Sequence, residues 1–79
     1  MQKFHEKALD LLEEGKWEEA HSLVGGESDE FSALIHALVH RHEGDTGNAA
    51  YWYRRAGEEP PQNSLKEELA RLRAMGVKM

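Results

Sequence analysis

Apolar residues recur along the chain with the three-to-four-residue spacing of amphipathic helices. No five-residue window alternates apolar and polar residues in the β-branched, aromatic style of a strand. The pattern predicts five helices, at about residues 2–14, 16–24, 28–43, 46–59 and 64–75. The chain is therefore expected to be all-α and to form one helical domain over residues 1–79.

Local signals set the expected helix ends. Glycines are predicted to end four of the helices, at Gly15, Gly25-Gly26, Gly44 and Gly76. The expected N-terminal signals are Ser28 for the third helix, Asp45 or Thr46 for the fourth, and a capping box of Ser64 and Glu67 for the fifth. Pro60 and Pro61 require the fourth helix to end before them.

An internal repeat relates two parts of the chain. The segments LLEEGKWEEAHSLV (11–24) and VHRHEGDTGNAAYWY (39–53) share one pattern at an offset of 29 residues. The offset pairs Gly15 with Gly44 and Ala20 with Ala49, and small residues recur where two antiparallel helices must approach closely. We interpret the chain as two αα-hairpins, at about 2–24 and 28–59, with a capping helix at about 64–75.

The second hairpin resembles the tetratricopeptide repeat. The matching residues are Ala37, Gly44, Asp45, Ala49, Tyr53, Ala56 and Pro61, and the string YWYRRAG is similar to a Sel1-type helix. The string from His40 to Gly57 also resembles one found in a group of small uncharacterised proteins, which implies no activity. The repeat resemblance implies an irregular helical-hairpin array that binds other proteins.

Composition and charge argue against several classes of function. The 79 residues carry a formal net charge of −5, and basic residues form no clustered excess of the kind that binds nucleic acid. There is no cysteine, so any metal would be held by histidine and carboxylate. No apolar run has the length of a membrane span, and the first ten residues lack the hydrophobic segment of a signal peptide, so a cytoplasmic protein is expected. No nucleophile-elbow sequence surrounds the serines, and we expect no catalytic activity and no cofactor.

Two histidines are the sharpest chemical candidates. His36 and His40 are one helical turn apart, and Glu43 follows on the same stripe. This arrangement is compatible with a structural hydrogen-bonding pair, or with a site for a metal ion or small ligand built from these three side chains. The remaining histidines, His5, His21 and His42, are predicted to be ordinary surface or boundary residues.

The fourth predicted helix has two different faces. Trp52 and Tyr53 are expected in the core, whereas Tyr51, Arg54 and Arg55 are expected outside. An ion pair between Arg54 and Glu58 is predicted on that outer face. It is either a solvated surface or a contact patch for an acidic peptide or another subunit, because Tyr and Arg are frequent at binding hot spots.

A second predicted contact surface is an apolar strip that runs from Leu9 to Leu34 and Leu38. It would accept a partner helix or a second copy of the chain, because a short array of hairpins leaves one face uncovered unless the fifth helix crosses it. The leading functional interpretation is a non-catalytic protein-interaction or assembly module. The alternative is a metal- or ligand-binding protein that uses His36, His40 and Glu43. The sequence leaves the identity of any partner open.

Overall fold

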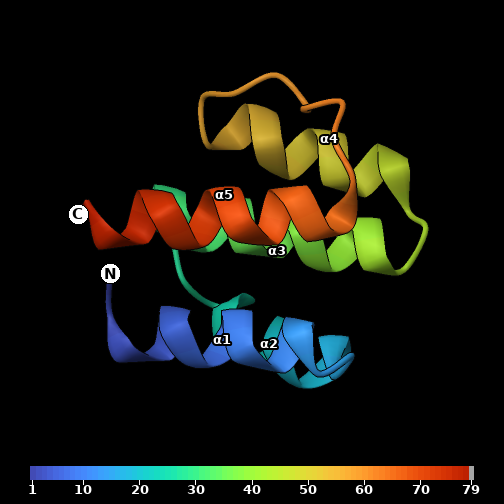
Figure 1. The fold of residues 1–79 in the computed structure, drawn as a ribbon. Coiled ribbons are helices and arrows are strands. Elements are labelled where there is room, and N and C mark those ends of the chain that lie inside the picture. The colour runs from blue at the N-terminus through green and yellow to red at the C-terminus, as the bar shows by residue number, and fades with distance from the viewer. Residues whose placement is uncertain (79) are drawn as a thin grey trace.

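The computed structural model describes residues 1–78 and has five helices (Figure 1). They are α1 (Lys3–Glu13), α2 (Trp17–Val24), α3 (Glu30–His42), α4 (Thr46–Arg55) and α5 (Leu65–Val77). No strand occurs in this part of the chain. The all-α prediction is confirmed, with five helices near the predicted positions.

The first two pairs of helices are hairpins with the same turn. Gly15 and Gly44 have φ of 79° and 80°, the left-handed conformation that glycine adopts without steric cost. Gly15 N–H donates to the Leu12 carbonyl, and Lys16 N–H donates to the Leu11 carbonyl. The same two hydrogen bonds recur 29 residues later, which makes both helix ends Schellman motifs.

Small residues line the close approaches inside both hairpins. Ala20 and Ala49 are buried, and so are Ala8 and Ala37, which the 29-residue offset also pairs. The absence of a larger side chain at these positions lets the helices of each pair come together. Burial of all four alanines agrees with the internal repeat predicted from the sequence.

The N-terminal caps are mostly as predicted. Ser64 and Glu67 form the expected capping box, and Asp45 caps α4 by accepting from Asn48 N–H. The prediction of Ser28 as the cap of α3 is wrong, because Asp29 takes that position and accepts from Ser32 N–H. A carboxylate at this position also suits the positive end of the helix dipole.

Helix α5 packs across α1 and α3 (Figure 1). Leu72 is its fully buried anchor, and Arg73 reaches α1 through ion pairs with Asp10 and Glu13. The helix does not stop before Gly76 as predicted but continues to Val77. Gly76 instead permits a close contact, since a Cβ atom there would lie 2.7 Å from Met1 Sδ.

This position of α5 overturns the predicted apolar strip. Leu9 and Leu38 are 0% exposed and Leu34 is 3% exposed, so all three belong to the core. Helix α3 has neighbours on every side, because it contacts all four other helices. The three leucines therefore form no contact surface for a partner helix or a second copy in this fold.

Among the described residues, no helix combines the length and apolarity needed to cross a membrane.

Candidate functional site

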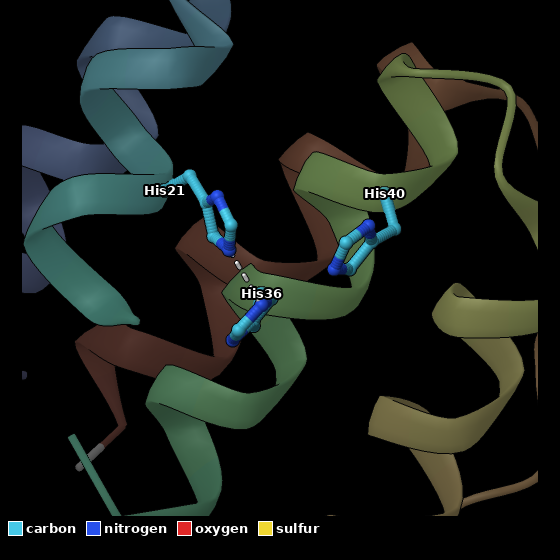
Figure 2. A group of neighbouring side chains, drawn as sticks. All are labelled: His21, His36 and His40. Carbon is cyan, nitrogen blue, oxygen red and sulfur yellow. Dashed lines mark hydrogen bonds between the residues drawn. The ribbon is translucent and has the colours of Figure 1, made fainter. Parts of the chain in front are cut away.

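Three histidines from two helices converge on one point (Figure 2). His36 and His40 lie one turn apart on α3, and His21 reaches them from α2. One ring nitrogen from each residue can be chosen so that all three lie within 4.8 Å of one another. We call these three residues the histidine cluster.

His21 and His36 are directly paired. Their Nε2 atoms are 2.8 Å apart, a hydrogen-bond distance, with the ring centroids 4.5 Å apart. One ring must donate its Nε2–H and the other must accept, so the two imidazoles carry different tautomers when both are neutral. This pair alone has the form of a structural hydrogen bond.

His36 is held in its neutral form. It is 6% exposed, and burial, followed by the charges that His21 and His40 would carry, lowers its pKa to about 4. Near neutral pH its imidazole is therefore uncharged and keeps a nitrogen lone pair, the form in which histidine binds metal ions.

His40 is the member of the cluster whose side chain forms no hydrogen bond with the described residues. Its buried Nδ1 lies 3.0 Å from Glu43 Oε1 and 4.0 Å from Asp45 Oδ2. The contact with Glu43 does not have the geometry of a hydrogen bond, so Nδ1 has no partner in the described chain. The distal edge of the ring points toward the other two histidines (Figure 2). A buried polar atom left in this state costs free energy unless something else satisfies it.

Trp52 covers the histidine cluster from α4. Its ring stacks on His36 with centroids 3.9 Å apart and an interplanar angle of 15°. The Arg55 guanidinium lies 5.2 Å from the Trp52 ring centroid. Trp52 was expected in the core, but it is only partly buried and packs against an imidazole at the edge of the core.

The sequence identified part of this site. The structure brings His36 and His40 together with Glu43 beside them, as the spacing predicts. His21 is partly buried, which agrees with its prediction as a surface or boundary residue, but its contact with His36 was not predicted. A signal was available, because Ala20 and Val24 mark the buried face of α2 and His21 lies at its edge.

His5 differs from its prediction as a surface or boundary residue. It is buried, and its Nε2 lies 2.9 Å from both Asp29 Oδ2 and Ser32 Oγ, which ties α1 to the start of α3. His42 is half-buried, and its Nε2 has no hydrogen-bond partner in the described part of the chain. Burial, followed by the Arg41 charge, lowers the pKa of His42. Neither residue belongs to the histidine cluster.

The outer face of α4 is the second candidate site. It consists of Tyr51, Arg54 and Arg55, all of them exposed as predicted. Arg55 Nη1 donates to the Tyr51 hydroxyl at 3.1 Å, and these residues and Gly47 line a shallow hollow. Arg54 is 3.6 Å from Glu59, so the predicted pair with Glu58 is wrong.

Glu58 instead belongs to a polar network that the sequence did not reveal. Its carboxylate pairs with Arg71 at 2.8 Å, and Arg71 also binds Glu68, which is 0% exposed. The Tyr53 hydroxyl donates to Glu68 Oε2 at 2.7 Å, and Asn63 Nδ2 donates to Oε1 at 2.9 Å. We call the buried carboxylate of Glu68 and its three donors, Tyr53, Asn63 and Arg71, the Glu68 network.

The chain matches no family model, no curated protein and no solved structure with significance. The fold and its sites therefore define a small all-helical domain of five helices, and any function has to be argued from the side chains themselves.

Proposed function

We propose that this protein is a non-catalytic interaction module, similar to a tetratricopeptide-repeat hairpin array, that binds an acidic segment of a partner protein. The observation that carries the proposal is the outer face of α4. There a tyrosine and two arginines stand exposed around one shallow hollow.

The two arginines are available to a ligand. Within residues 1–78 no carboxylate lies within ion-pair distance of Arg55, whose guanidinium is held by Tyr51 and Trp52. Arg54 has only an exposed partner at 3.6 Å, and such surface pairs contribute little. A guanidinium can take a carboxylate in a bidentate pair, which gives both orientation and affinity.

Charge complementarity selects the kind of partner. The whole chain carries −5, so an acidic segment is repelled by most of the surface. Salt screens charges beyond roughly 8–10 Å, and the residues that line the hollow include two arginines and no acidic residue. Tyr51, which is 53% exposed, adds a rigid aromatic surface of the type found at binding hot spots.

The test is a titration of the isotope-labelled protein with an oligoglutamate peptide that contains one tyrosine, followed by NMR. We expect shifts concentrated at Tyr51, Arg54 and Arg55 that diminish as salt rises. Arg55→Glu should weaken binding roughly tenfold, or about 1.4 kcal/mol. Lys66→Glu, the same charge change at an exposed position of α5, is the matched control and should bind like the parent.

Equal weakening in Arg55→Glu and Lys66→Glu would show a general charge effect and contradict the proposal. Binding of an oligolysine peptide at the same residues would also contradict it.

A further inference from the structure

We propose that the histidine cluster is a binding site for a divalent transition-metal ion, with zinc as the first choice. The ligands are His21 from α2 and His36 and His40 from α3. The inference is independent of the peptide site, because its residues lie on other helices and its test uses a metal salt alone.

The spacing of the nitrogens is close to that of a metal centre. Zinc–nitrogen bonds of about 2.0–2.1 Å in tetrahedral geometry place the ligand nitrogens about 3.3 Å apart. His21 and His36 are slightly closer than that, at 2.8 Å, and all three nitrogens lie within 4.8 Å of one another. Coordination requires the rings to turn so that the longest of these separations shortens toward about 3.3 Å.

The type of ligand selects the type of metal. Imidazole nitrogen suits zinc, copper and nickel, whereas magnesium and calcium prefer oxygen ligands. Three protein ligands leave one of the four zinc positions for water or an incoming molecule. Since His21 and His40 are only partly buried, the site lies at the edge of the fold and an ion has a path to it.

Two carboxylates complete the surroundings of the site. Glu43 Oε1 lies 3.0 Å from His40 Nδ1, and Asp45 Oδ2 lies 4.0 Å from the same atom. If His40 binds metal through Nε2, its Nδ1–H can be donated to Glu43 after a small rotation. A carboxylate in this role fixes the orientation of the ring and raises the basicity of the ligand. The two negative charges also balance the charge of a divalent ion.

A purely structural role accounts for only part of the cluster. The hydrogen bond between His21 and His36 satisfies one nitrogen of each ring. It leaves His40 with its distal edge turned toward the pair and its buried Nδ1 without a hydrogen bond. The inference depends on the convergence of three imidazoles, whose ring nitrogens lie within 4.8 Å of one another although only two of the rings are hydrogen-bonded together.

The experiment is calorimetric titration of zinc chloride into untagged protein that has been freed of metal by a chelator. We expect one ion per chain and a rise in melting temperature on binding. His21→Gln, His36→Gln and His40→Gln should each weaken zinc binding by more than the roughly 10–100-fold expected for Glu43→Gln, which removes only the orienting carboxylate.

His42→Gln is the matched control, because it removes an imidazole from the end of the same helix without touching the cluster. It should bind zinc like the parent. Equal loss in His42→Gln, or unchanged binding in all three cluster variants, would overturn the proposal. So would a parent protein that gives no heat and no change in melting temperature.

A second measurement uses only intact ligands and so does not depend on the folding of the cluster variants. In a Trp17→Phe protein, Trp52 is the sole tryptophan and stacks on His36. Copper(II), which quenches indole fluorescence at short range, should quench it in a saturable way, and zinc should compete. Quenching that zinc fails to reverse would count against a shared site.

Discussion

Two clusters of polar side chains in this small fold differ in how fully their atoms are paired. In the Glu68 network, the buried carboxylate accepts hydrogen bonds from Tyr53, Asn63 and Arg71. In the histidine cluster, one N···N hydrogen bond joins two rings, and His40 Nδ1 has no partner among residues 1–78. The first cluster is complete within the chain, whereas the second has capacity left for a ligand.

The two clusters also differ in the charge state of their buried group. Burial by itself raises the pKa of Glu68, but hydrogen bonds from Arg71, Asn63 and Tyr53 outweigh it and hold that pKa below its ordinary value. The carboxylate is therefore charged and compensated. In the histidine cluster no such compensation opposes burial at His36, and the group stays neutral instead. A buried charge such as that of Glu68 depends on its partners and has no bonding capacity left for a ligand. A neutral imidazole can give up a proton or a hydrogen bond and bind a metal ion instead.

The largest loss of stability is expected from Glu68→Ala. The substitution leaves the Tyr53 hydroxyl without its acceptor and the Arg71 guanidinium with Glu58 alone. Removing one partner from a buried ion pair costs about 3–5 kcal/mol, and urea unfolding of the parent and variant measures the difference. Lys66→Ala, an exposed neighbour, should change stability by less than about 0.5 kcal/mol. A loss below about 1 kcal/mol in Glu68→Ala would mean that the network contributes little.

The next effect is a loss of stability of the metal-free protein in mild acid. His36 binds a proton at about 6.5 when unfolded but only at about 4 when folded, so the unfolded state takes up more protons between these values. The free energy of unfolding is therefore unaffected by this group above pH 6.5. It falls as the pH drops toward 4, by about 3 kcal/mol in total, because each pKa unit corresponds to about 1.36 kcal/mol. His21 and His40 face His36 from α2 and α3, with Glu43 and Asp45 beside His40.

Unfolding by urea at several pH values, with a chelator present, measures this slope. His36→Gln should flatten it. Glu68 affects stability in a more acidic range. Because its pKa is lowered in the folded state, its stabilising contribution is fully present above the ordinary glutamate pKa and is lost as the pH falls through the lowered value. A parent protein equally stable at pH 7.5 and 5 would contradict the enclosure of a neutral His36.

The smallest effect is predicted for His40→Leu in the absence of metal. Because His40 Nδ1 has no hydrogen bond within residues 1–78, an apolar residue of similar size should change the free energy of unfolding by less than about 1 kcal/mol, and in the stabilising direction. The comparable deletion in the other cluster, Tyr53→Phe, removes a hydrogen bond to a charged group and should cost about 1.5–3 kcal/mol. Thermal or urea unfolding of both variants gives the comparison. Equal losses of unfolding free energy in the two variants would contradict the difference in hydrogen bonding between the two clusters.

The sequence predicted those features that depend on near neighbours. The glycine turns, the capping box and the face of α4 that carries Tyr51 were all correct, because their hydrogen bonds or helix positions span only a few residues. His36 and His40 were found for the same reason. Even the error at the start of α3 was a shift of one residue between two good capping residues, Ser28 and Asp29.

Features that depend on distant contacts were missed. His21 joins His36 across 15 residues, and Glu68 receives the Tyr53 hydroxyl across the same separation. His5 reaches Ser32 across 27 residues. The predicted strip of leucines failed because the position of α5 decides what α1 and α3 expose, and no local pattern gives that position.

The most direct test of the contrast between the two clusters is a crystal structure of zinc-treated protein with anomalous diffraction data recorded at the zinc edge. We predict one anomalous peak, about 2.0–2.1 Å from a ring nitrogen of each of His21, His36 and His40, with the Glu68 network unchanged. A map with no peak at the histidine cluster, and with the hydrogen bond between His21 and His36 still in place, would contradict the account.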